Sequence, residues 1–218
     1  MKVPQPFPYQ GSKRNLAPAI LGYFPEGVTT LIEPFAGSAA ITLHAATQDL
    51  AERFVINDLN EPLPFPGQSF DAVVSLDVVL HLQDRAEFFQ EVARLLTRNG
   101  RFLFTDAGVI TGPISSEDVR KRSAHGYTQF VIPGWNEQLL ASAGLSLIET
   151  EDRTHSVWKN AEGRLAAMTA HRAELERLSS ASAVFKQEEY LEAVIGLSKR
   201  RALSRVMYLV EHRACTAV

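Results

Sequence analysis

Short apolar segments alternate with amphipathic helical patterns along this chain, and that alternation constrains its fold more than any other feature. Four apolar segments predict strands, at 31–33, 54–58, 70–76 and 101–107. Helical patterns lie at about 39–50 and 86–96. The segment FDAVVSL (70–76) is almost continuously apolar, as in a strand covered on both faces of a sheet. Because parallel strands need helical crossovers, the order predicts an α/β fold with a mostly parallel sheet.

The C-terminal part departs from that simple alternation. A helical pattern at 136–144 is followed by a predicted strand at 145–151, and the last predicted strand lies at 203–213. Helical patterns at 157–178 and 186–198 separate these two strands. We therefore expect one domain over 1–218, ending in an antiparallel hairpin that carries a helical insertion at about 153–200. A loop of about 25 residues is expected after residue 107.

Composition narrows the function classes. The 218 residues are 45% hydrophobic with a formal net charge of −3, which suits one ordinary core and disfavours nucleic acid as a partner. No apolar run approaches the ~20 residues that span a bilayer, so a cytoplasmic protein without membrane contact is expected. The single cysteine, Cys215, cannot form an internal disulfide or a metal-binding pair, and no metal site is predicted.

Two candidate binding features follow the first two predicted strands. In LIEPFAGSAA a strand ends at Glu33, a small-residue turn follows, and a helix begins. In doubly wound folds ligands bind at such strand ends, and Gly37 lets a ligand approach the backbone. Asp58 ends the second strand, where a carboxylate can accept both ribose hydroxyls of a nucleoside. Structural alternatives are a plain strand–helix turn at Gly37, and a helix cap or a solvated loop acid at Asp58.

The segments FPYQGSKRNLAPAIL, LIEPFAGSAA and FVINDLN, in that order, resemble Dam-type DNA adenine methyltransferases over residues 5–61. In that family the corresponding residues bind S-adenosyl-L-methionine. The resemblance therefore implies cofactor contacts by Tyr9, Lys13 and Asp58, and it places Glu33, Gly37 and Ser38 in the cofactor loop.

Residues 62–213 resemble a different group, the type 11 small-molecule methyltransferases. LPFPGQSFDAVVSLDVVLHLQDRAEFFQEVARLLTRNGRFLFTDA and GYTQFVIPGWNEQLLASAGL carry this likeness. Both resemblances imply a Rossmann-like class I methyltransferase fold that uses S-adenosyl-L-methionine. The second resemblance also implies a small-molecule acceptor. It also implies that the backbone of Ser75, Leu76 and Asp77 touches the methionine part of the cofactor.

Several polar residues further along the chain have two interpretations. His81 would share a helical face with Asp77 and is a candidate general base, although a packed or capping histidine is the stronger alternative. Asp106 ends a predicted strand and is expected to be structural. The basic cluster Lys199, Arg200, Arg201 and Arg205 is expected to be a solvated strand end rather than a contact for an acidic substrate or nucleic acid.

Two departures from the parent families shape the functional prediction. Adenine methyltransferases carry an Asp-Pro-Pro-Tyr-like motif where this chain has Ser75-Leu76-Asp77-Val78, so base chemistry is not expected. Only eleven residues separate Asp58 from Phe70, too few for the usual helix and third strand. The sheet is therefore predicted to be shortened between its second and fourth strands, with a weakened or open adenine site. A partner chain in a homo-oligomer could supply the missing wall.

Three functions follow from these patterns. The first is methyl transfer from S-adenosyl-L-methionine to a small-molecule acceptor. The second is a DNA-directed enzyme related to adenine methyltransferases. The third is a catalytically silent binding protein with a methyltransferase fold.

Overall fold

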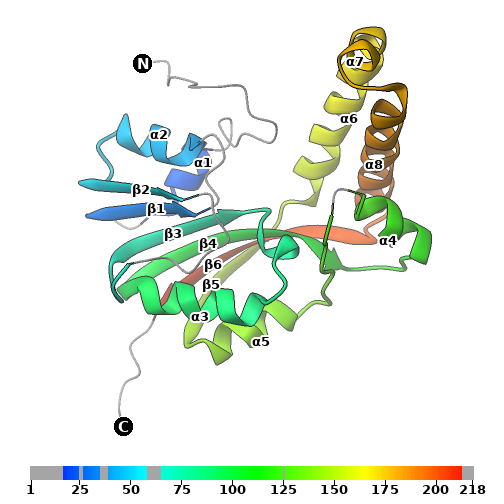
Figure 1. Ribbon diagram of the computed structural model, residues 1–218. Helices are drawn as coiled ribbons and strands as arrows, with labels where there is room; N and C mark the ends of the chain where they lie inside the picture. Colours follow the sequence, from blue (N-terminus) through cyan, green and yellow to red (C-terminus); the bar gives the residue numbers. More distant parts are fainter. Residues whose placement is uncertain (1–16, 25–26, 35–38, 58–64, 125, 213–218) are drawn as a thin grey trace.

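A single six-stranded sheet forms the centre of the molecule (Figure 1). The computed structural model describes residues 17–24, 27–34, 39–57, 65–124 and 126–212. The strand order is β2-β1-β3-β4-β6-β5. The strands are β1 Thr30–Pro34, β2 Arg53–Asn57, β3 Phe70–Leu76, β4 Leu96–Ile110, β5 Leu145–Asp152 and β6 Leu203–His212. Strands β2, β1, β3 and β4 run parallel, and β6 is antiparallel to both β4 and β5. The predicted fold, including its terminal antiparallel hairpin, is confirmed.

The shortening of the sheet is confirmed as well. In the described residues β2 is the edge strand beside β1, and β3 follows it along the chain without an intervening helix or strand. Ile56 of β2 is 53% exposed, which is unusual for an isoleucine in a sheet with covered faces. This exposed edge is where a further strand would otherwise pair.

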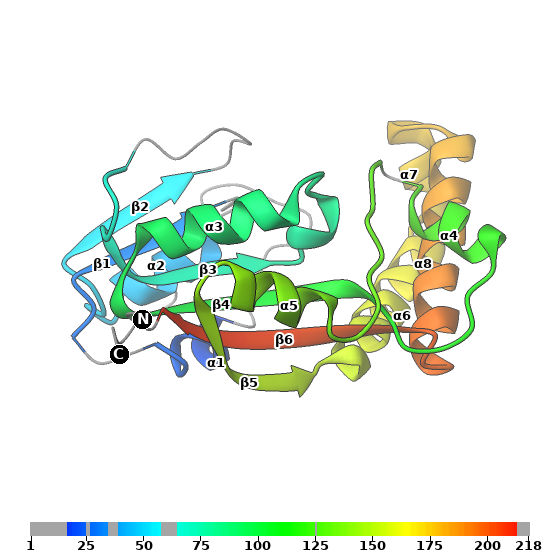
Figure 2. The same cartoon turned by 90° about the horizontal axis from the view of Figure 1, so that it is seen from below.

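Helices cover both faces of the sheet (Figures 1 and 2). On one face α1 and α2 pack on the sheet, and on the other α3 and α5 do. The apolar positions of the central strands alternate accordingly. Leu31, Val74 and Leu103 contact the first pair of helices, whereas Val73 and Phe102 contact the second. The helices are α1 Ala17–Leu21, α2 Ala40–Ala46, α3 Arg85–Leu95, α4 Ser116–Arg122, α5 Trp135–Ser142, α6 Thr154–Ala170, α7 Arg172–Leu178 and α8 Ala181–Lys199.

The insertion between β5 and β6 consists of α6, α7 and α8 and projects away from the sheet (Figure 1). Ala161 of α6 packs against Leu191 and Val194 of α8, so the insertion has a small core of its own. The prediction of one helix over 157–178 is wrong. Helix α6 ends at Ala170, His171 separates it from α7, and α7 packs against α8. None of the described helices is long and apolar enough to cross a membrane.

Two further expectations are corrected. The long loop after β4 contains the short helix α4, which begins with a capping box between Ser115 and Asp118. Asp77 and His81 do not share a helical face, because Asp77 has a left-handed backbone (φ 58°) and only Val79–His81 form a single 3₁₀ turn. The left-handed residue ends β3 sharply and redirects the chain toward α3.

Candidate functional site

The carboxyl ends of the parallel strands meet at one edge of the sheet. Pro34 is in register with Asn57, and Leu76 is in register with Thr105, so β1, β2 and β3 all end at this edge. Five predicted cofactor residues lie outside the described residues, namely Tyr9, Lys13, Gly37, Ser38 and Asp58. The structure therefore describes one part of the predicted site, from Glu33, Ser75, Leu76, Asp77 and His81.

Glu33 connects the end of β1 to the beginning of α2. Its side chain is buried, and Oε2 accepts a hydrogen bond of 2.9 Å from the Thr42 backbone N–H. Burial raises the pKa of the Glu33 carboxyl above its usual value, while the hydrogen bond from the Thr42 backbone N–H acts in the opposite direction. The residue thus holds the strand–turn–helix unit together, and its predicted contact with a cofactor stays a prediction.

Asp77 lies at the same edge, in a compact polar network with β4 and β6. Its backbone N–H donates to Thr105 Oγ1 at 2.9 Å, and that hydroxyl donates to Asp77 Oδ1 at 2.8 Å. Arg205 approaches from β6 and forms an ion pair of 2.8 Å with Asp77 Oδ2. Three strands are therefore joined through one carboxylate.

Arg205 corrects an expectation about the basic cluster. Its side chain is only 9% exposed, so it is not part of a solvated strand end. The side chains of the other three cluster members are about half-exposed or more. Each forms an ion pair with an acid: Lys199 with Glu162, Arg200 with Asp118 and Arg201 with Asp152. Sequence alone could not separate Arg205 from its neighbours, because the alternation along β6 that turns it inward depends on strand register.

Two buried hydroxyls at this edge lack a hydrogen-bond partner among the described residues. They are Ser75 Oγ at the end of β3 and Thr42 Oγ1 in the first turn of α2. Buried polar groups are normally satisfied, so such atoms commonly mark a place where a ligand or further polar groups complete the site. The two hydroxyls lie near the predicted cofactor site, and the cofactor contact predicted for the backbone of Ser75 stays a prediction.

His81 is held by a loop and not by Asp77. Its Nδ1 lies 2.9 Å from the Tyr127 carbonyl oxygen, and the residue is exposed. A histidine that donates from Nδ1 to a carbonyl keeps its Nε2 lone pair available for a proton. The candidate general base is thus oriented, and its catalytic role stays a prediction.

Sequence reasoning missed a second polar cluster beneath this edge. Arg85 of α3 forms a buried ion pair with Asp106 of β4, and Asn136 Nδ2 of α5 donates to Asp106 Oδ2 at 2.9 Å. Arg85 also donates to the Gln129 carbonyl oxygen at 2.7 Å. Asp106 is structural as expected, and the pair fixes α3, α5 and the long loop to the sheet. The signal in the sequence was a lone acid at the end of an apolar strand.

Comparison with known proteins agrees with this topology. Residues 22–104 match the family model described as a methyltransferase domain. A putative sarcosine dimethylglycine methyltransferase from Galdieria sulphuraria superposes with a TM-score of 0.69 at 18% identity, over 89% of this chain and 82% of that one. This chain has the class I methyltransferase fold. A Haemonchus contortus phosphoethanolamine N-methyltransferase 2, solved with phosphomonomethylethanolamine and S-adenosylhomocysteine, has a TM-score of 0.76 at 15% identity, over 91% of this chain and 52% of that one.

Curated relatives with sequence similarity include N-methyltransferases. Phosphoethanolamine N-methyltransferase of Triticum aestivum is 28% identical over 153 residues, 70% of this chain and 29% of that protein. Sarcosine/dimethylglycine N-methyltransferase of Aphanothece halophytica is 26% identical over 161 residues, 69% of this chain and 53% of that protein. The chain spans less than a third of the length of the first relatives it matches.

The comparisons bear on both expected resemblances. The methyltransferase-domain match begins at residue 22, well inside the segment 5–61 that resembles Dam-type enzymes. The family match and the similar structures and relatives support the class I methyltransferase fold and its link to S-adenosylmethionine chemistry. They do not show the Dam-type resemblance, which stays a prediction.

Proposed function

We propose that this chain transfers a methyl group from S-adenosyl-L-methionine to a small-molecule acceptor. The observation that carries the proposal is the juxtaposition, within a class I methyltransferase fold, of the Glu33–α2 unit with the end of β3 at Asp77. The fold binds ligands at the carboxyl ends of its strands, and both features lie at that edge. Similarity to N-methyltransferases of phosphoethanolamine and of sarcosine supports the small-molecule acceptor.

The residues proposed to hold the cofactor come from four segments. They are Tyr9 and Lys13, the turn with Glu33, Gly37 and Ser38, the acid Asp58, and Ser75, Leu76 and Asp77 after β3. When bound, S-adenosyl-L-methionine supplies an activated sulfonium methyl group. The protein then contributes mainly position, by aligning an acceptor lone pair with the carbon–sulfur bond that breaks. The products are the methylated acceptor, S-adenosylhomocysteine and a proton.

Proton removal is the one chemical step assigned to a side chain. An amine acceptor, as the relatives' names suggest, loses its proton before or after attack. His81 is proposed as the acceptor of that proton, because Nδ1 is held by the Tyr127 carbonyl and Nε2 is left for the substrate.

The adenine end of the site is proposed to be weak. The missing third strand leaves β2 as an edge with Ile56 exposed, so one wall of the nucleoside site is absent from the described part of the sheet. We expect the monomer to bind the cofactor with micromolar or weaker affinity. Sub-micromolar affinity with a large thermal shift in the monomer would contradict this expectation.

Calorimetry with S-adenosylhomocysteine tests the proposal directly. We expect saturable binding that is lost in Asp58→Asn. Asp49→Asn is the control and should keep binding, because Asp49 is an exposed acid in the connection between α2 and β2. Mass-spectrometric assays with sarcosine, dimethylglycine and phosphoethanolamine then report methylation. No heat at millimolar ligand would favour the catalytically silent binding protein, and a salt-sensitive gel shift of duplex DNA would revive the DNA-directed enzyme.

A further inference from the structure

A β-bulge interrupts the pairing between β4 and β6 just beyond the end of β3. Asp106 is in register with Val206, and Val109 is in register with Ser204. The two β4 residues between them therefore lie opposite a single β6 residue, Arg205. Bulges of this kind re-aim side chains and are frequent beside active sites. The direction of the Arg205 side chain is thus set by an irregularity of the sheet at the edge that carries the candidate site.

The Arg205 side chain reaches from β6 across β4 to the turn that follows β3. Its Nη2 lies 2.8 Å from Asp77 Oδ2 and 3.4 Å from Thr105 Oγ1. Asp77 has a left-handed backbone with a φ of 58°, which a residue other than glycine keeps only when its surroundings hold it there. The contacts from Arg205 and Thr105 supply that restraint, so they determine the shape of the turn.

The main chain of Arg205 holds the beginning of the helical insertion. Its N–H donates to Thr154 Oγ1 at 3.0 Å, and its carbonyl oxygen accepts from the Arg153 N–H at 2.8 Å. Thr154 is buried and is the first residue of α6. One residue of β6 therefore joins the start of α6, through its backbone, to the turn after β3, through its side chain.

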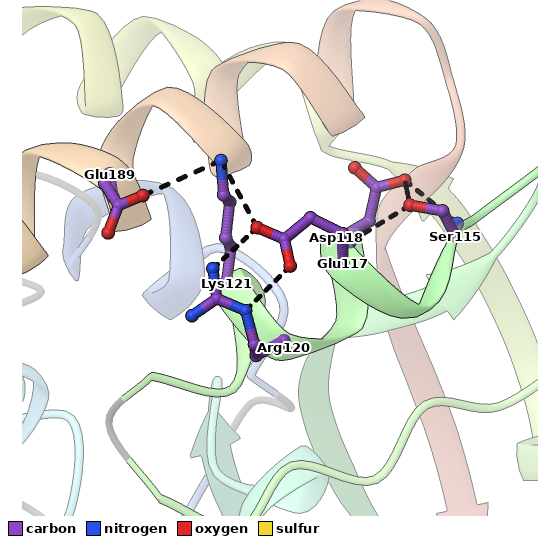
Figure 3. A network of polar contacts seen from close by, with 6 residues as sticks. All are labelled: Ser115, Glu117, Asp118, Arg120, Lys121 and Glu189. Carbon is purple, nitrogen blue, oxygen red and sulfur yellow. Dashed lines mark hydrogen bonds and ion pairs between the residues drawn. The ribbon is translucent and has the colours of Figure 1, made fainter.

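The insertion has another attachment, which consists of ion pairs at the surface. Lys121 of α4 lies 3.7 Å from Glu189 of α8, and Figure 3 shows it between Glu189 and Glu117 of its own helix. Water and salt screen partly exposed pairs of this kind, so they contribute little. The attachment at Arg205 is buried, and we expect it to be the one through which the insertion and the candidate site affect each other.

Stability alone does not explain why an arginine is buried here. Arg205 Nε is buried without a hydrogen-bond partner among the described residues, and an unpaired buried N–H is unfavourable. Taking an ion pair such as Asp77–Arg205 out of water also costs desolvation that often cancels its attraction. A role in fixing the geometry of the turn accounts for this arrangement.

We propose that Arg205 is a positioning residue for S-adenosyl-L-methionine. Its guanidinium keeps the turn of Ser75, Leu76 and Asp77 in the one conformation that binds the methionine part of the cofactor, and its main chain ties this turn to α6. The inference rests on the proposed methyl transfer, which places the cofactor beside the turn. Cofactor binding at the turn and order at the start of α6 should therefore depend on each other through Arg205.

Two measurements on the full chain test this proposal. Calorimetry gives the dissociation constant of S-adenosylhomocysteine, and hydrogen exchange with mass spectrometry follows peptides over 75–82 and 153–160, with and without this ligand. In the wild type the ligand should slow exchange in both peptides. Arg205→Gln should weaken binding about tenfold or more, because a charge-assisted hydrogen bond that holds the turn is lost. It should also speed exchange over 75–82 without ligand and abolish the ligand's effect over 153–160.

Further variants separate positioning from folding. Arg205→Lys keeps a charge that can pair with Asp77, so it should regain part of the lost affinity. Asp77→Asn removes the same ion pair from its other side and should weaken binding similarly, with no further loss in the double variant. Leu140→Ala lowers stability by removing core packing under α5, and it should keep the wild-type dissociation constant. Lys121→Gln breaks the surface attachment and should change neither measurement. If Arg205→Gln does not fold, Asp77→Asn provides the same two readouts.

The outcomes distinguish this inference from the proposed function. If the wild type binds S-adenosylhomocysteine, an unchanged affinity in Arg205→Gln overturns the inference, and so does an equal loss in Leu140→Ala. Ligand protection over 153–160 that persists in Arg205→Gln overturns it as well. If the wild type does not bind, the proposed methyl transfer fails, and exchange without ligand still decides whether Arg205 holds the turn. Faster exchange over 75–82 in Arg205→Gln alone would then keep that restraint, and unchanged exchange would reject it too.

Discussion

Removal of the buried Asp106 carboxylate should destabilise the protein strongly. Asp106 is fully buried and accepts hydrogen bonds from Arg85, from Asn136 at 2.9 Å and from the Gly108 backbone N–H at 2.8 Å. In Asp106→Ala the Arg85 guanidinium stays buried without its counter-ion. Breaking a buried pair by removing one partner costs about 3–5 kcal/mol. For a chain of this size that lowers the melting temperature by about 6–20 °C.

Urea unfolding followed by far-ultraviolet circular dichroism measures this free energy, with the melting temperature as a second readout. The double variant Arg85→Met with Asp106→Leu removes both charges, and it should regain most of the lost stability because the uncompensated charge is gone. Glu117→Ala breaks an exposed pair with Arg120 and should leave the midpoint unchanged. A loss below about 1 kcal/mol in Asp106→Ala would refute the claim that this pair fixes α3 and α5 to the sheet.

Three further predictions concern the site and its surroundings. Because burial raises the folded-state pKa of Glu33, its stabilising contribution is present below about pH 4.5 and is lost as pH rises through the raised pKa. Glu33→Gln should therefore be more stable than the wild type at pH 7 and equally stable near pH 4, and urea midpoints across pH check this. Asp77→Asn keeps the left-handed backbone but removes the counter-ion of Arg205. It should lower unfolding free energy by about 1.5–3 kcal/mol, and an unchanged urea midpoint would contradict the network. A Cβ at Gly112 would lie 2.8 Å from the Arg201 carbonyl oxygen, whereas one at Gly163 meets nothing within 4 Å. Gly112→Ala should thus lower the free energy of unfolding by about 1–3 kcal/mol, and Gly163→Ala should raise it by about 0.5–1 kcal/mol. The melting temperatures of the two variants should therefore shift in opposite directions. A shift in the same direction would contradict this packing.

The sheet could be predicted because its information is local and periodic. The apolar run 70–76 matches β3 at both ends, and the predicted strand 145–151 is one residue short of β5. Eleven residues between Asp58 and Phe70 cannot hold a helix and a strand, so chain length alone predicted the shortened sheet. Helix ends were harder, because the break at His171 depends on how α7 packs against α8, and the 157–178 pattern is helical on both sides of it.

The polar sites were also predicted only in part from the sequence. Sequence determined which residue types stand at the strand ends, since Glu33, Ser75 and Asp77 follow directly from the strand positions and from the family resemblance. Only the tertiary structure decided that Arg205 turns inward to Asp77, that Arg85 pairs with Asp106, and that Arg122 faces a cavity. Asp77 and Arg205 are 128 residues apart, Arg85 and Asp106 are 21 residues apart, and the residues that line the cavity span 98 positions from Ala107 to Arg205. A periodic pattern records which way a side chain faces within its own element, but a buried charge is stabilised by a partner that the fold brings from elsewhere in the chain.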